Sequence, residues 1–387
     1  MEPVAQYPHF SEAEYTRRYI AIRALMQAAD VAALVVYGSP SYMQGDVHYL
    51  TNYATTREAI CIFPLEGAPT LFVQMYNHVP TARKVACIND VQWGGTDTVA
   101  TAANHLHALG LAEKRIGIIG RFPAQHDQTL RTALPKSTLI SFGPQLMQLR
   151  LIKSAEEIDA LRRGAQFCDL AVEALQQQVR PGMVEYELAA IVQGAYLHLG
   201  GRNSLHYMAT TPMAQPSVCV PAQYQSDRVL AAGDVLITEL SASWMEGYPG
   251  QILRSFTIAS APTPTYQHLF DVAVEAFQRI TQVIHPGATT NDVLDAAQYI
   301  HDEGYTIYDD LVHGYGGGYL APILRTRQTS AHIEPPMVFQ ENMTIVVQPN
   351  IITPDERMGV QVGQLLRITA TGVESLHRIP MEFLRCD

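Results

Sequence analysis

Apolar positions in the first 150 residues follow strand spacing in some segments and helical spacing in others. The predicted strands are residues 31–37, 58–63, 69–74 and 115–119, and the predicted helices are residues 11–28, 98–111 and 125–134. Ser11 is the expected N-cap of the first helix. Strands that alternate with helices predict an α/β N-terminal domain with a mostly parallel sheet covered on its faces.

A change of pattern near residues 143–153 predicts a domain boundary. Gly143 and the proline after it open an irregular segment, and Ser154 with Glu157 three residues later forms the sequence of a capping box at the start of a long helix. We therefore expect an N-terminal domain over residues 1–148 and a second domain over residues 149–387.

The second domain contains an internal repeat. Residues 169–175 (DLAVEAL) are echoed by residues 271–277 (DVAVEAF), and each copy is followed by a Pro-Gly pair and then by an acidic residue at the same offset, Glu187 or Asp292. Each half is predicted to run from helix to Pro-Gly turn to helix to strands. Two such halves can pack around a pseudo-twofold axis and leave a cleft between them, which predicts an α+β domain.

Residues 233–256 are predicted to form the central hairpin of this domain. The segment opens with a Gly-Asp turn and an apolar run, and a turn at residues 245–247 separates two strand-like stretches. Glu239 and Gln251 lie in these two stretches. Two polar side chains are thus expected on facing strands.

This hairpin resembles that of the pita-bread hydrolases, the family of creatinase, prolidase and aminopeptidase P. His313 in VHGYG, Gln348 in MTIVVQP and Gly363 in GVQVG extend the resemblance. It implies the pita-bread fold for the C-terminal domain and a creatinase/prolidase-like N-terminal domain. It also implies that Glu239, Gln251, His313, Gln348 and Gly363 occupy the family's five metal-ligand positions, of which His313 is unchanged and Glu239 is conservatively replaced.

The replaced ligand residues determine whether this site can hold metal ions. A dinuclear hydrolytic centre needs several carboxylates to neutralise and bridge two dications. One carboxylate, one imidazole and two neutral amides leave that charge uncompensated, and Gly363 has no side chain. We predict that the chain lacks the dinuclear centre and uses no metal or cofactor, with a single metal on Glu239 and His313 left open.

The family's two proton-transfer histidines are also replaced at their usual places. His206 and His332 are the candidates to substitute for them, and Glu334 lies beside the second. The resemblance further suggests Tyr53 and Arg57 as substrate contacts, since that part of the N-terminal domain reaches the partner's active site in dimeric relatives. The predicted catalytic residues are Glu239, His313 and His332. The predicted substrate-binding residues are Gln251, Gln348, His206, Tyr53 and Arg57.

Composition and charge bear on which partners the protein binds and where it is located. The net charge of −11 disfavours binding to nucleic acid or to an anionic membrane, because both need clustered basic residues. No apolar run approaches the ~18 residues of a membrane span, and the five cysteines lie far apart without a Cys-x-x-Cys pair. We expect a cytoplasmic protein, with homodimerisation implied by the family.

Three functions remain open from the sequence. The favoured one is a metal-independent, creatinase-like hydrolase that cleaves an amide, guanidino or amidine C–N bond in a small polar substrate, with His313 transferring the proton. The alternatives are a non-catalytic pseudoenzyme that binds a ligand or a protein, and a metal-dependent Xaa-Pro peptidase with a degenerate single-metal site.

Overall fold

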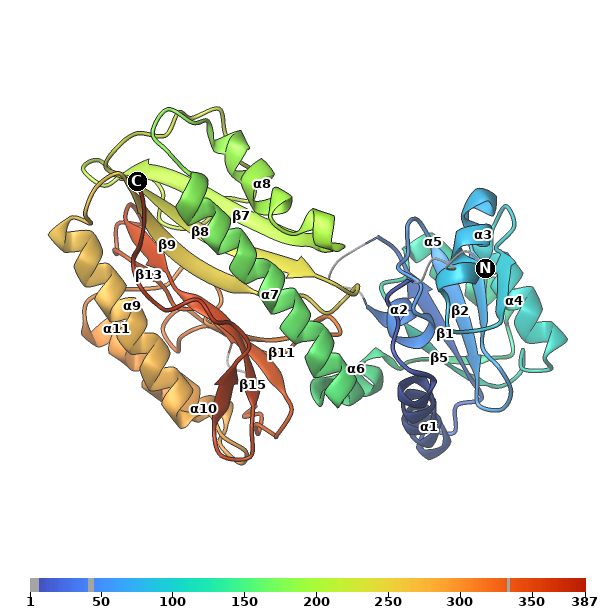
Figure 1. Ribbon diagram of the computed structural model, residues 1–387. Coiled ribbons are helices and arrows are strands. Elements are labelled where there is room, and N and C mark those ends of the chain that lie inside the picture. The colour runs from blue at the N-terminus through green and yellow to red at the C-terminus, as the bar shows by residue number, and fades with distance from the viewer. Residues whose placement is uncertain (1–6, 41–44, 333–334) are drawn as a thin grey trace. The chain divides into compact units, whose positions relative to one another are not determined.

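The computed structural model describes residues 7–40, 45–332 and 335–387. The chain divides into two compact units, Met1–Arg150 and Leu151–Asp387, and each is described by itself (Figure 1). In the part of the chain that the model describes, no helix has the length and apolar character needed to span a bilayer.

Unit 1 is a six-stranded sheet with helices, in the strand order β4-β3-β2-β1-β5-β6. Its strands are β1 (Ala33–Gly38), β2 (Ala59–Pro64), β3 (Thr70–Val73), β4 (Asp90–Trp93), β5 (Arg115–Ile119) and β6 (Thr138–Ser141). Its α-helices are α1 (Glu12–Ala28), α2 (Asp46–Thr51), α3 (Val79–Val85), α4 (Thr98–Ala108), α5 (Ala124–Ala133) and α6 (Gly143–Leu151), the last ending at the boundary between the units.

Both faces of this sheet are buried, which explains the continuous apolar runs in its sequence. Leu34 and Val36 of β1 belong to one core cluster, whereas Ala33, Val35 and Tyr37 belong to another. Alternate residues of one strand therefore serve two cores. The expected N-cap of α1 is present, since the Ser11 hydroxyl accepts from the Glu14 amide.

The sheet is more mixed than the sequence suggested. β1–β5, β3–β4 and β5–β6 are parallel, but β1–β2 and β2–β3 are antiparallel. Residues 65–69 alone connect β2 to β3, and a connection this short cannot carry a crossover to a parallel neighbour. Residues 49–51 form the last turn of α2, which is followed by Asn52 in the left-handed conformation.

Unit 2 contains a nine-stranded sheet whose main path runs β11-β10-β12-β15-β9-β8-β7. The strands of the path are β7 (Arg202–Pro212), β8 (Asp234–Ser243), β9 (Ile252–Ile258), β10 (Val312–Tyr315), β11 (Tyr319–Leu324), β12 (Thr344–Val347) and β15 (Gly363–Ile368). β16 (Val373–Ser375) pairs with β15 and β17 (Leu384–Cys386) pairs with β9, off the main path, and β13 (Asn350–Ile352) pairs with β14 (Gly359–Gln361). The α-helices are α7 (Ala155–Gln178), α8 (Glu185–Gly194), α9 (Pro264–Val283), α10 (Thr290–Ala296) and α11 (Gln298–Asp302).

The repeat predicted from the sequence is visible in the helix starts. Gly182 and Gly287, in the two Pro-Gly pairs, both have φ of 93°. Glu187 then accepts from the Val184 amide at the start of α8, and Asp292 accepts from the Thr289 amide at the start of α10. The two acidic residues at equal offset thus cap equivalent helices. The capping box of Ser154 and Glu157 at the start of α7 is also present.

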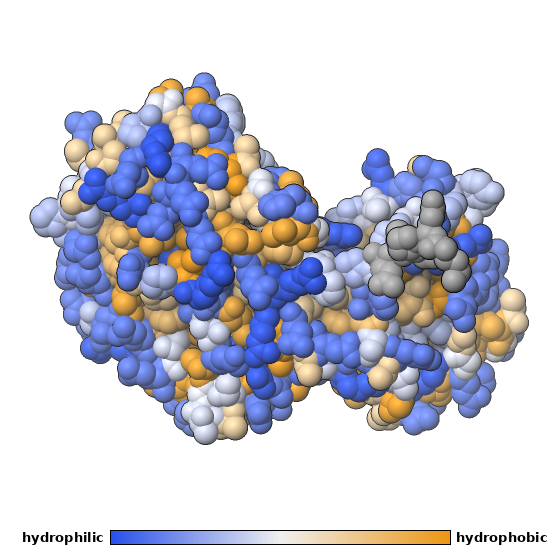
Figure 2. Space-filling model, in the orientation of Figure 1, coloured by the Kyte–Doolittle hydropathy of each residue, from blue (hydrophilic) through white to orange (hydrophobic). Residues whose placement is uncertain are grey.

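The central strand β8 is buried along its whole length, but its two faces differ in chemistry. Leu236, Leu240 and Ala242 pack into the core with α7 and α8, which lie along β7–β9 in Figure 1. Because side chains alternate along a strand, Glu239 points to the opposite face. The outer surface of unit 2 mixes polar and apolar residues in the view of Figure 2.

Candidate functional site

The three polar residues expected at the centre of the site are joined by hydrogen bonds. Gln251 Nε2 donates to Glu239 Oε1 at 2.7 Å and to Gln348 Oε1 at 3.2 Å. Gln348 Nε2 donates in turn to the carbonyl oxygen of Asp310 at 3.1 Å. All three of these predicted side chains are buried, with exposed fractions of 2–7%. The sheet therefore brings residues far apart in sequence into one polar chain.

His313 lies beside this chain, on β10. Its ring is buried, stacks on Tyr319 at a centroid distance of 4.3 Å and meets the edge of Tyr315 at 5.2 Å. Nδ1 lies 3.3 Å from the carbonyl oxygen of Gly314. A Cβ at Gly314 would lie 2.4 Å from the Ala321 oxygen, so only glycine lets the two strands come this close.

Four further residues complete the site. Asp309 and Asp310 are half-buried and lie three and two residues before β10. The Tyr319 hydroxyl donates to Asp310 Oδ2 at 2.6 Å, and Gln361 Nε2 donates to Asp309 Oδ2 at 3.3 Å. None of these four residues was predicted from the sequence as part of the site. The acidic pair three and four residues before His313 was the available signal, but such a pair is more often a solvated turn.

Burial dominates the electrostatics of the site. Loss of solvent, with the nearby charges of Asp309 and Asp310, raises the pKa of Glu239 to about 8 despite the hydrogen bond from Gln251. Burial lowers the pKa of His313 to about 4. Burial and the charge of Asp310 also raise the pKa of Asp309. At pH 7 Glu239 is thus mostly protonated and His313 is neutral.

This donor set does not fit a dinuclear metal centre. Gln251 turns its amide N–H groups, not its oxygen, toward Glu239 and Gln348, so it offers no lone pair in that direction. At the fifth position, a Cβ on Gly363 would lie 2.4 Å from the Val347 oxygen and 2.6 Å from Gln348 Cα. Packing therefore excludes a side chain where the family places its last carboxylate. Among the described residues, no group of three or more His, Cys, Asp or Glu could hold a metal ion.

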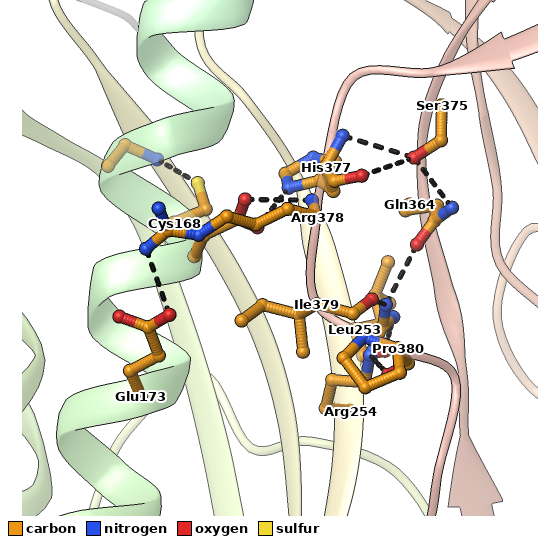
Figure 3. Close-up of polar contacts among 12 residues, drawn as sticks. Cys168, Glu173, Leu253, Arg254, Gln364, Ser375, His377, Arg378, Ile379 and Pro380 are labelled. Atoms are coloured by element: carbon orange, nitrogen blue, oxygen red, sulfur yellow. Dashed lines mark hydrogen bonds and ion pairs between the residues drawn. The ribbon is translucent and has the colours of Figure 1, made fainter.

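A buried arginine supports the backbone behind the site (Figure 3). The Arg254 side chain is fully buried and donates to the backbone oxygens of Leu253, Gly363, Ile379 and Pro380 and to Gln364 Oε1. It thereby ties β9 to β15 and to the segment that follows β16. Burial lowers the pKa of this guanidinium to about 10, so it remains charged at neutral pH.

The predicted histidines outside β10 are not in the buried polar chain. His206 belongs to β7, pairs with Leu240 and hydrogen-bonds the Tyr196 hydroxyl at 2.8 Å. Its neighbour Tyr207 pairs with Glu239, so His206 faces the helix-covered side of the sheet. His206 therefore lies on the other face of the sheet from Glu239, and its role as a substrate-binding residue remains a prediction. His332 is exposed on the loop between β11 and β12, and Glu334 lies outside the described residues.

The two candidates in unit 1 occupy different environments. Tyr53 is buried in the core of that unit, and its hydroxyl lies 3.2 Å from Thr56 Oγ1. The Arg57 side chain is exposed. Their roles as substrate contacts remain predictions.

The mixed N-terminal sheet, the repeated C-terminal architecture and the polar chain on its central strands define a pita-bread hydrolase. The model of metallopeptidase family M24 matches residues 159–370, and that of the creatinase/prolidase N-terminal domain matches residues 18–152. The chain therefore belongs to metallopeptidase family M24, as the sequence motifs indicated.

Named relatives match from about two thirds of the chain to nearly all of it. The probable dipeptidase PepE of Mycobacterium tuberculosis is 24% identical over 97% of this chain and 97% of its own. The Xaa-Pro dipeptidase of Pyrococcus furiosus is 26% identical, over 62% of this chain and 66% of its own. Among solved structures, the Xaa-Pro dipeptidase from Bacillus anthracis has a TM-score of 0.80 at 20% identity, covering 96% of this chain and 99% of that one.

These comparisons refine the functional interpretation. Family membership makes the chain a hydrolase that acts on C–N bonds and disfavours the non-catalytic alternative. The named relatives support the peptidase alternative better than a creatinase-like reaction on a guanidino or amidine compound. The family is one of metallopeptidases, whereas the donor set of this chain does not fit a dinuclear metal centre.

Proposed function

We propose that this protein hydrolyses the amide C–N bond of a small peptide-like substrate without a dinuclear metal centre. Glu239 acts as general acid and His313 as general base. One observation carries the proposal: the buried Glu239 receives its hydrogen bond from the neutral amide of Gln251, which leaves the carboxyl group without a cation partner and favours its protonated form. The relatives named dipeptidase support a peptide bond as the one cleaved.

The chemistry follows from the protonation states. With Nδ1–H directed at the Gly314 oxygen, the other ring nitrogen of His313 is free of a proton and accepts one from water. The hydroxide oxygen then bonds to the substrate carbonyl carbon. The Gln348 amide keeps one N–H beyond its bond to Asp310, and this N–H can donate to the developing oxyanion.

Collapse of the tetrahedral intermediate breaks the C–N bond as Glu239 donates its proton to the leaving nitrogen. The products are an amine and a carboxylic acid. Transfer of the proton held by His313 to the Glu239 carboxylate restores the starting state, so the cycle consumes one water and needs no other reactant. A raised carboxyl pKa suits Glu239 to the acid role at pH 7.

A second candidate function is a metal-dependent Xaa-Pro peptidase with a single ion, and the names of the relatives favour it. Glu239 and His313 are the residues that would hold such an ion.

In either case we propose a homodimer in which Tyr53 and Arg57 of one subunit approach the substrate of the other. Sedimentation analysis tests the dimer, and an Arg57→Ala effect on KM alone tests the contact.

The deciding experiment combines metal analysis with turnover. The protein is stripped with chelator, its metal content is measured, and hydrolysis of dipeptides, Xaa-Pro dipeptides and simple amides is followed before and after adding manganese, cobalt or zinc. Turnover in the stripped protein that is lost in Glu239→Gln and kept in the exposed-site control Glu303→Gln supports the proposal. Turnover only with added metal refutes it in favour of the second candidate.

A further inference from the structure

Two half-buried carboxylates beside the polar chain receive hydrogen bonds from neutral groups. Asp309 accepts from the Asp310 amide at 2.8 Å and from Gln361 Nε2, and Asp310 accepts from the Tyr319 hydroxyl. The charge of Arg325 reaches Asp309, but Arg325 Nη2 donates to the Tyr308 carbonyl oxygen instead. Both aspartates are half-buried, so water screens their charges only in part.

A buried acceptor lies next to this pair without a partner. Gln361 is fully buried, and its Oε1 has no hydrogen-bond donor among the described residues. The bond from Nε2 to Asp309 fixes the orientation of this amide, because the flipped form would set two oxygens against each other. A buried acceptor left unsatisfied costs ~1–3 kcal/mol, and a donor from a ligand would remove that cost.

These acceptors call for a ligand with several N–H groups and a positive charge. We propose that Asp309, Asp310 and Gln361 Oε1 bind the cationic N–H group of the substrate, a primary ammonium or a guanidinium. The assignment rests on the proposed function, because it names the substrate class of that same site. It places the cation at the segment that precedes β10.

The geometry favours an organic cation over a metal ion. Both oxygens of Asp309 and one oxygen of Asp310 already accept an N–H or O–H bond, which leaves the remaining lone pairs spread over three side chains. Calcium needs about six to eight oxygens converging on one point. An ammonium carries three donors and a guanidinium carries five in a planar fork, and either can reach acceptors that lie apart.

Equilibrium binding tests the inference without turnover. Calorimetry at pH 7 compares propylammonium and ethylguanidinium with the neutral analogues propanol and ethylurea on the full chain. Asp309→Asn and Asp310→Asn remove one charge each with little change in shape, and Asp302→Asn on the exposed end of α11 is the matched control. Circular dichroism checks that each variant is folded.

We expect wild type and Asp302→Asn to bind at least one of the two cations, and both site variants to bind it about 10-fold or more weakly, as for the loss of a charged hydrogen bond. The preferred cation identifies the group, ammonium or guanidinium. Equal binding of cations and neutral analogues overturns the inference, as does unchanged affinity in both site variants or displacement of the cation by calcium or manganese at equimolar concentration.

The failures of the two proposals are distinguishable. Cation binding that depends on Asp309 and Asp310, in a protein that cleaves no amide, upholds the cation site and refutes the proposed function. Cleavage of neutral amides, with no preference for substrates that carry an ammonium or guanidinium, upholds the proposed function and refutes the cation site.

Discussion

Replacing Glu239 with glutamine is expected to stabilise the protein while abolishing its activity. The pKa of this carboxyl group rises from its ordinary 4.5 to about 8 in the folded chain. The folded state therefore holds a proton that the unfolded state releases, and stability is lost as the pH rises from about 4.5 to about 8. Glutamine does not titrate, and it keeps an oxygen to accept from Gln251.

The size of the effect follows from linkage. Each pH unit between the two pKa values changes the free energy of unfolding by about 1.4 kcal/mol. From pH 4.5 to pH 7, the wild type should lose about 3 kcal/mol relative to Glu239→Gln, and about 4 kcal/mol by pH 8 and above. The free energy of unfolding gained by Glu239→Gln is smaller if the new amide N–H finds no acceptor. The pH dependence of the difference between variant and wild type is unaffected.

Chemical denaturation at several pH values measures this slope. The chain has two tryptophans, Trp93 in unit 1 and Trp244 in unit 2, so a Trp93→Phe background makes fluorescence report on unit 2. Glu303→Gln controls for the change of one carboxylate to an amide at an exposed position of unit 2. A stability difference between Glu239→Gln and its parent that stays constant from pH 5 to pH 8 would refute the protonated state of Glu239, and with it the acid role.

Three further predictions follow from the site. The pH profile of kcat/KM should rise through pH about 4, where His313 loses its proton, and fall through pH about 8, where Glu239 ionises. A profile whose rising and falling limbs both lie at other pH values contradicts these roles. Arg254→Met should destabilise unit 2 by ~3 kcal/mol or more, because several buried oxygens lose their donor, whereas the exposed Arg279→Met should change it by ~0.5 kcal/mol or less in denaturation. Gly363→Glu should lower the melting temperature and bind no additional manganese in calorimetry, and tight manganese binding would show that the backbone yields.

The sequence predicted those parts of the molecule that depend on local chemistry. The capping box at Ser154 and the paired caps at Glu187 and Asp292 follow from contacts within a few residues. The placement of Glu239 and Gln251 on the two arms of one hairpin follows from the pairing of β8 with β9, with Gln251 directly before β9. Each of these features needs one turn or one pair of strands to form, so a pattern in the sequence suffices to predict it.

The remaining features depend on the assembled sheet. His206 is separated from the site by the alternation of side chains along β7, which the sequence shows only once the register with β8 is known. Asp309 becomes a site residue because Gln361, more than 50 positions later, donates to it. The sheet of unit 1 was expected to be mostly parallel, and only the pairing of β1, β2 and β3 shows how far it departs from that expectation.

The hydrogen bond from the Gln251 amide to Gln348 joins the two halves of the repeat. Glu239 and Gln251 belong to the first half, and Gln348 belongs to the second. Neither half on its own holds the polar chain, so a fragment or a partly folded intermediate that contains one half lacks the catalytic arrangement. Turnover during refolding therefore reports the docking of the halves rather than the formation of either, and its delay behind the helical signal would time that last step.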